Sequence, residues 1–145
     1  HGNGVILAET YLNALSTIET LKTAGVKFLL QEYIEESNGS DLRIFVVDGE
    51  VVAAMKRQSK NGDFRSNLHR GGSSLNVKLT YEEESVALKA AKAVQLGVCG
   101  VDILQSKKGP LVLEINSSPG LEGIEKTTGI NISKKIISYI ERNKR

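Results

Sequence analysis

Two neighbouring segments of this chain carry oxygen ligands at a spacing that constrains both its fold and its chemistry. Asp102 lies in one apolar run, and Glu114 and Asn116 lie two residues apart in the next. Because strand side chains alternate between faces, Glu114 and Asn116 must point the same way. A five-residue loop at 106–110 would place Asp102 directly across from Glu114, where Cβ atoms are about 5 Å apart. We therefore expect an antiparallel hairpin that gathers three oxygen ligands on one face.

Such a set of ligands suits a magnesium ion, which binds oxygen, takes few ligands from the protein and is usually completed by nucleotide phosphates. The alternative is an ordinary hairpin with a polar, solvated face. Two flanking features favour the metal site. Leu111, Leu113 and Ile115 give the other face an apolar stripe, and residues 116–120 end the strand in a loop suited to backbone contacts.

The order Asp, then Glu-x-Asn, then Pro-Gly resembles the metal-binding signature of the ATP-grasp superfamily. The longer string at 114–125 resembles its RimK branch, which consists of ATP-dependent ligases that add glutamate to a carboxylate-bearing acceptor. The strings at 55–58 and 64–72 resemble the same branch. The similarity runs through nearly all of the chain.

The resemblance implies an α+β fold, the C-terminal lobe of an ATP-grasp domain, with a mostly antiparallel sheet and flanking helices. It also implies an ATP-dependent carboxylate–amine ligase that works through an acyl phosphate, with ATP and a pair of Mg²⁺ or Mn²⁺ ions. The expected reaction adds L-glutamate to a protein C-terminus, such as that of a small-subunit ribosomal protein. Two alternatives stay open: a ligase of amino-acid or coenzyme biosynthesis, and a module that binds Mg·ATP without catalysis.

The same resemblance assigns roles to individual residues. The expected metal ligands are Asp102, Glu114 and Asn116, and the expected catalytic residues are Arg43 and Arg65. The expected nucleotide contacts are Glu32 and Tyr33 at the purine, Asp41 at a ribose hydroxyl, and Arg65, Ser66 and Asn67 in a loop that contacts ATP.

Some of these residues also have plainer interpretations. Asp41 can equally belong to the turn that opens a strand, and Arg43 can lie on an exposed sheet face. His69 could act as a base, although a lone histidine in a polar loop is more often structural.

Hydrophobic periodicity and turn residues predict the secondary structure. Asp48-Gly49 is a strong hairpin signal, and Thr80 with Glu83 forms a capping box at a helix start. The expected elements are helix 7–23, strands 27–34, 41–47 and 50–58, helix 80–96, the metal hairpin, a turn region at 120–129 and helix 130–142.

The tight turn of the first hairpin fixes its register. In that register Arg43 faces Ala54, which leaves it room to reach across a cleft, and Lys56 lies beside Asp41. Arg57 falls on the apolar face unless a bulge re-aims it. The alternate residues of the first strand are expected to serve only the core: Leu42, Ile44 and Val46.

The composition is that of a globular protein, with 145 residues, 40% of them hydrophobic and 25% charged. A net charge of +2 gives no strong argument for nucleic acid or membrane partners, and no stretch approaches the roughly 20 apolar residues of a membrane span. The single cysteine, Cys99, cannot form an internal disulfide, and we expect it in the core, in agreement with a reducing cytoplasm. The partners that the resemblance implies are ATP, L-glutamate and the carboxylate acceptor, and a homo-oligomer stays open.

The chain begins at His1 without an initiator methionine, and Gly2 and Gly4 precede the first predicted helix. The resemblance implies that these glycines are the tail of a glycine-rich loop that closes over phosphates. A strand with an ATP-binding lysine would precede that loop, so we expect residues 1–145 to be an ATP-grasp domain truncated on its N-terminal side and inactive alone. The alternative is a free, disordered N-terminus.

Overall fold

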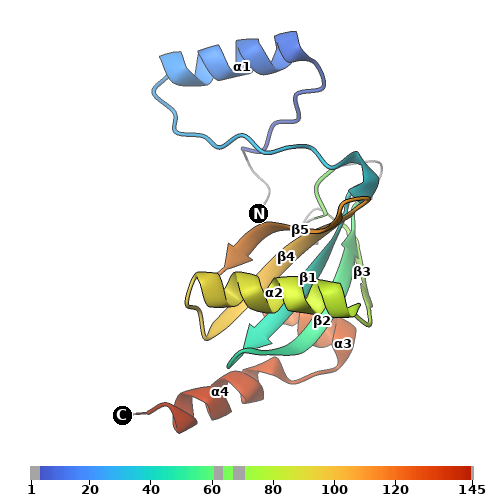
Figure 1. Ribbon diagram of the computed structural model, residues 1–145, viewed down its shortest axis with the longest axis vertical. Coiled ribbons are helices and arrows are strands. Elements are labelled where there is room, and N and C mark those ends of the chain that lie inside the picture. The colour runs from blue at the N-terminus through green and yellow to red at the C-terminus, as the bar shows by residue number, and fades with distance from the viewer. Residues whose placement is uncertain (1–3, 61–63, 67–70, 145) are drawn as a thin grey trace. The chain divides into compact units, whose positions relative to one another are not determined.

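The computed structural model of the chain (Figure 1) describes residues 4–60, 64–66 and 71–144. The chain consists of two compact units, His1–Glu35 and Glu36–Arg145. Among the described residues, every strand of the sheet lies in the second unit. No helix in these ranges is both long and apolar enough to cross a membrane.

The first unit contains helix α1, Tyr11–Thr23. The helix begins later than the predicted residue 7 because Thr10 has an extended backbone and its side chain accepts a hydrogen bond from the Asn13 amide at 3.2 Å. Such a cap satisfies an amide that the first turn leaves unpaired. The strand predicted at 27–34 is wrong, since no strand of the described sheet pairs with this segment and a strand needs a hydrogen-bonded neighbour.

The second unit is built on a five-stranded sheet in the order β3-β2-β1-β4-β5, and every neighbouring pair is antiparallel. The predicted α+β fold with a mostly antiparallel sheet is therefore confirmed. The elements of this part of the chain are η1 (Glu35–Ser37), β1 (Ser40–Val47), β2 (Glu50–Gln58), β3 (Ser73–Asn76), α2 (Tyr81–Ala93), β4 (Val98–Ser106), β5 (Gly109–Asn116), α3 (Glu122–Thr128) and α4 (Ile132–Arg142).

Helices cover both faces of the sheet, α2 on one and α3 and α4 on the other (Figure 1). Phe45 of β1 packs with Ile124 and Ile132 on the side of α3 and α4. The fully buried Cys99 lies in the core on the α2 side, as predicted, and burial raises the pKa of its thiol. The same side holds the three β1 residues predicted to serve the core: Leu42, Ile44 and Val46.

The structure confirms two local features that the sequence predicts, the Asp48-Gly49 turn and the capping box. Asp48 and Gly49 have φ angles of 55° and 74°, the left-handed geometry of a two-residue hairpin turn. The capping box forms at the start of α2. The turn region predicted at 120–129 is wrong, because α3 occupies most of it; complete burial of Ile124 stabilises a short helix that its glycine content disfavours.

The β1–β2 ladder contains a bulge between Phe45 and Val46, which leaves Val52 without a partner of its own on β1. A bulge adds one residue to one strand and shifts every pair beyond it. As a result, Arg57 lies opposite Asp41.

The register predicted from the tight turn is therefore wrong beyond the bulge. Lys56 does not lie beside Asp41, and Arg43 faces Met55 in place of Ala54. The extra residue re-aims Arg57 toward the carboxylates of the sheet.

The β4–β5 hairpin reaches its predicted pairing by a different route. Its turn consists of residues 107–108, so the five-residue loop predicted at 106–110 is wrong. A bulge next to Asp102 then shifts the register by one residue in the opposite sense. Asp102 consequently lies opposite Glu114, as predicted.

Candidate functional site

Asp102 lies in the middle of β4 and is almost fully buried, with 1% of its surface exposed. Arg43 on β1 donates from Nε to Oδ1 and from Nη2 to Oδ2, the second bond measuring 2.6 Å. Arg57 on β2 donates from Nη2 to Oδ2 at 2.7 Å. Two guanidiniums therefore share one carboxylate through charge-assisted hydrogen bonds, which are stronger than neutral ones.

Arg57 also binds Asp41, its partner across the β1–β2 ladder. Nε donates to Oδ1 at 2.7 Å and Nη2 to Oδ2 at 2.6 Å, the parallel bonds of an arginine fork. Both residues are buried, and the Ser66 hydroxyl donates to Oδ2 of the same carboxylate. Burial alone would lower the pKa of Arg57, but the hydrogen bonds and charges of Asp41 and Asp102 raise it above its ordinary range. This guanidinium is therefore permanently charged.

Glu114 and Asn116 lie on the same face of the hairpin, closer to solvent. Arg43 Nη2 is 4.0 Å from Glu114 Oε1, so one guanidinium contacts the carboxylates of both strands. Asn116 Nδ2 donates to Glu114 Oε1 at 3.0 Å. The structure thus brings together the three side chains predicted as metal ligands, with Asp102 buried and the Glu114 side chain 56% exposed.

The donor atoms of this face suit a hard divalent cation. Within the ranges that the structure describes, no group of three or more His, Cys, Asp and Glu side chains could hold a metal ion, so the candidate set is two carboxylates and one amide. That set fits Mg²⁺, which takes few protein ligands.

Two residues of this site were not among the predicted site residues. Gly100 lets the Arg43 stem and Pro119 approach β4, because a Cβ there would lie 2.9 Å from Pro119 Cβ and 3.3 Å from Arg43 Cδ. Arg57 joins the two buried aspartates. The sequence did indicate a role for Arg57, because an arginine within an apolar strand is rarely buried unless a carboxylate pairs with it.

The predicted nucleotide loop is described in part. Ser66 is buried and joins the cluster through Asp41. Arg65 is half-buried, with its Cζ atom 5.1 Å from the centroid of the Phe64 ring, a distance at which a cation–π interaction is favourable. Asn67 and His69 lie outside the described residues.

Glu32 and Tyr33 belong to the first unit, in the irregular segment after α1, and Tyr33 is half-exposed. Their predicted contact with the purine stays a prediction.

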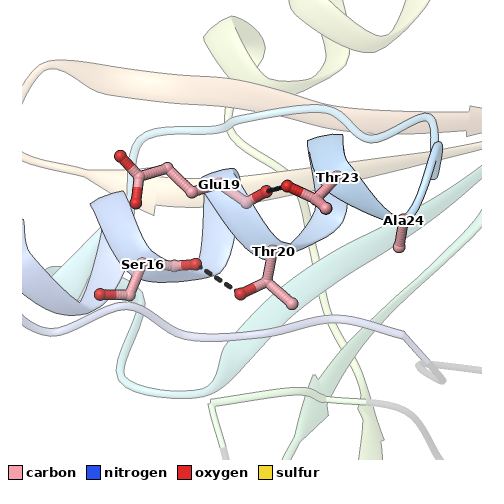
Figure 2. Close-up of a pocket in the computed structure, with 5 residues that line it drawn as sticks. All are labelled: Ser16, Glu19, Thr20, Thr23 and Ala24. Carbon is pink, nitrogen blue, oxygen red and sulfur yellow. Dashed lines mark hydrogen bonds between the residues drawn. The ribbon is translucent and has the colours of Figure 1, made fainter.

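The first unit also has a shallow hollow along α1 (Figure 2). Thr20 Oγ1 donates to the Ser16 carbonyl at 2.8 Å, and Thr23 Oγ1 donates to the Glu19 carbonyl at 2.9 Å. In both bonds the threonine hydroxyl donates its proton to a backbone carbonyl of the same helix. None of the lining residues, which also include Ala24, was predicted as a site residue.

Comparison with protein families gives a match to the RimK-like ATP-grasp domain over residues 1–140. A protein of Maridesulfovibrio salexigens named "Probable alpha-L-glutamate ligase" is 57% identical over 142 residues, which are 98% of this chain and 47% of that protein. A protein of the same name from Picosynechococcus sp. is 60% identical over 142 residues, with the same coverage of 98% and 47%. The chain thus spans about half the length of the curated relatives it matches.

Solved structures show the same fold. The D-alanine–D-alanine ligase of Bacillus anthracis superposes with a TM-score of 0.66 over 99% of this chain and 52% of that one, at 17% identity. The ATP-grasp ligase PsnB, complexed with its minimal precursor, Mg and ADP, has a TM-score of 0.57 at 26% identity, over 74% of this chain and 33% of that chain.

Proposed function

The chain belongs to the RimK-like ATP-grasp family, and from that membership we propose that the protein is an ATP-dependent carboxylate–amine ligase. One observation carries the proposal, namely the meeting of Asp102, Glu114 and Asn116 on one face of the β4–β5 hairpin beside Arg43. If this face of the hairpin were only polar and solvated, its carboxylates would be exposed. Asp102 is instead buried and is bound by two arginines.

The proposed reaction has two steps. A carboxylate oxygen of the acceptor attacks the γ-phosphorus of ATP, and the bond from that phosphorus to ADP breaks, which gives an acyl phosphate. The amino group of the second substrate then attacks the acyl carbon, inorganic phosphate leaves, and the nitrogen loses a proton. Phosphoryl transfer of this kind is catalysed mainly by positioning and by cancelling charge.

The residues of the cluster would divide this work. Asp102, Glu114 and Asn116 would hold Mg²⁺ or Mn²⁺, which supplies positive charge to the β- and γ-phosphates when bound; we propose a pair of ions. Arg43 lies beside these ligands and would steady the charge on the transferred phosphoryl group and on the attacking carboxylate, together with Arg65.

The proposed nucleotide contacts follow from the family resemblance. Glu32 and Tyr33 would meet the purine, and the loop with Arg65, Ser66 and Asn67 would contact ATP. For Asp41 the structure supports a different role from the predicted ribose contact, because the residue is 3% exposed and both its carboxylate oxygens accept bonds from Arg57.

The amine substrate we propose is L-glutamate, and the acceptor a protein C-terminus, such as that of a small-subunit ribosomal protein. The names of the relatives at 57% and 60% identity support the glutamate. The complex of the ATP-grasp ligase PsnB with its minimal precursor, Mg and ADP supports the use of a nucleotide and magnesium, and its complex with precursor peptide PsnA2 and AMPPNP supports a peptide as acceptor.

Turnover of the full-length protein tests the proposal. ATP, Mg²⁺, L-glutamate and a synthetic peptide that ends in glutamate are mixed, and ADP, phosphate and the mass of the peptide are measured. We expect equal amounts of ADP and phosphate, and a peptide heavier by one or more glutamyl residues. Glu114→Ala should abolish this turnover and leave the melting temperature nearly unchanged, since it removes a charge from an exposed position and no core volume.

Glu141→Ala is the matched control, because it removes the same group from an exposed position on α4, and it should retain turnover. Turnover by Glu114→Ala at saturating Mg²⁺ would contradict the proposed site. Tight binding of Mg·ATP by the unaltered protein without turnover on any acceptor would instead identify a nucleotide-binding module.

A further inference from the structure

We propose that Arg57 is a positioning residue for the metal site, which holds the Asp102 carboxylate in place through a buried pair that it forms with Asp41. The inference rests on the proposed function, in which Asp102 is a metal ligand. It goes beyond that function because Arg57 would act through Asp102, the carboxylate to which it donates, and would itself contact neither metal nor substrate.

The two arginines around Asp102 differ in how firmly they are held. The Arg57 side chain is 7% exposed and is fixed by the fork to Asp41. The Arg43 side chain is 13% exposed and extends toward Glu114, the open end of the cluster. Arg57 therefore lies between two buried carboxylates, whereas Arg43 lies between one buried and one exposed carboxylate.

The two oxygens of Asp102 differ in the same sense. Oδ2 accepts hydrogen bonds from both arginines, at 2.6 and 2.7 Å. Oδ1 is bound to Arg43 Nε. When a cation takes the place of Arg43 at Oδ1, Arg57 would still hold Oδ2, so the carboxylate would keep its orientation and would not become a buried, unpaired charge.

The fold places Arg57 for this task. The bulge at Val52 puts Arg57 opposite Asp41, and Asp41 in turn accepts the Ser66 hydroxyl. Partners of metal-binding carboxylates of this kind typically change metal affinity by about 10–100-fold when they are removed.

Arg57→Lys in the full-length protein is the first test. Lysine keeps the charge but has no planar fork, so it cannot hold both oxygens of Asp41 and reach Asp102 at once. The probe is Mn²⁺, titrated in the presence of a non-hydrolysable ATP analogue and followed by electron paramagnetic resonance. We expect the dissociation constant for Mn²⁺ to rise about tenfold or more, while the KM for glutamate stays unchanged.

Asp41→Asn is the second variant and keeps the shape of the side chain. It weakens the hydrogen bonds between Arg57 and residue 41, which is buried and does not bind the cation in our proposal. It should therefore also raise the Mn²⁺ dissociation constant. Arg142→Lys is the matched control, because Arg142 forms an exposed pair with Asp48 at 2.9 Å, and it should leave Mn²⁺ binding unchanged.

The outcomes separate this inference from the function it rests on. Unchanged Mn²⁺ affinity in the folded Arg57→Lys or Asp41→Asn protein would overturn the positioning role, even if the melting temperature falls. A higher KM for glutamate or the acceptor with unchanged Mn²⁺ affinity would also overturn it, by showing that Arg57 contacts substrate. If the unaltered protein binds no Mn²⁺, or binds it equally well after Glu114→Ala, the proposed function has failed and the inference falls with it.

Discussion

Replacing Gly100 with alanine should destabilise the fold, because three parts of the chain meet at this position. The added Cβ would stand 2.9 Å from Pro119 Cβ and 3.3 Å from Arg43 Cδ. The proline atom belongs to a ring fixed to the backbone, so the loop after β5 or the strand itself must move. Overpacking of this kind costs about 1–3 kcal/mol. Alanine is favoured over glycine in a strand by about 0.5–1 kcal/mol, and we therefore expect a net loss of about 1 kcal/mol.

Urea unfolding of the full-length protein measures this loss as a lower midpoint at an unchanged slope. Gly120→Ala is the matched control, since a Cβ at Gly120 has no atom within 4 Å, and it should change the stability by less than about 0.5 kcal/mol. Equal midpoints for the two variants, or a more stable Gly100→Ala protein, would refute the packing argument.

Three further predictions concern other parts of the second unit. The pKa of Glu125 is lowered by the hydrogen bonds that it accepts from the Ser133 amide and hydroxyl. The ionised Glu125 side chain therefore stabilises the folded state above the ordinary glutamate pKa of about 4.3, and this stabilisation is lost as the pH falls through the lower pKa of the folded state. The urea midpoints of Glu125→Gln and of the unaltered protein should differ at neutral pH and converge in acid. A difference that stays constant with pH would contradict this. Ile44→Ala should cost about 2–5 kcal/mol in urea unfolding, because Ile44 is fully buried in the core; a loss below 1 kcal/mol would count against it. Arg65→Ala should raise the KM for ATP with little change in melting temperature, and an unaltered KM would remove Arg65 from the nucleotide site.

The parts of the fold that were predictable depend on signals within a few residues. The Asp48-Gly49 turn forms because both residues accept positive φ angles. The capping box at Thr80 forms because its partner lies three residues further on. In both places the local chemistry agrees with the tertiary structure, so the sequence pattern sufficed.

The register of the sheet was harder to predict, because a bulge depends on packing across strands. Nothing in the sequence next to Val52 indicates that it lacks a partner on β1, yet this one residue moves Arg57 opposite Asp41. The pairing of Asp102 with Glu114 was correct only because a shorter turn and a bulge shift the register in opposite senses.

The remaining errors also have tertiary causes. The segment 27–34 has the residues of a strand, but no strand of the described sheet pairs with it. Residues 120–129 have glycines that suggest a turn, but Ile124 of α3 is buried in one cluster with Phe45 on the sheet face that α3 and α4 cover. Glu114 and Asn116 share a face whatever the register of β4, because they lie two residues apart on β5, whereas the pair of Arg57 with Asp41 depends on the register of β1 and β2.

The central claim is that a carboxylate of the acceptor is activated by the γ-phosphoryl group of ATP at this site. The most direct test uses a peptide that ends in glutamate and carries ¹⁸O in its C-terminal carboxylate, with the full-length protein, ATP, Mg²⁺ and L-glutamate. Mass spectrometry of the released phosphate measures where the label goes. An acyl phosphate predicts that one ¹⁸O atom passes from the carboxylate to inorganic phosphate, with ADP as the other product. Unlabelled phosphate during glutamate addition, or AMP and pyrophosphate in place of ADP and phosphate, would contradict the mechanism.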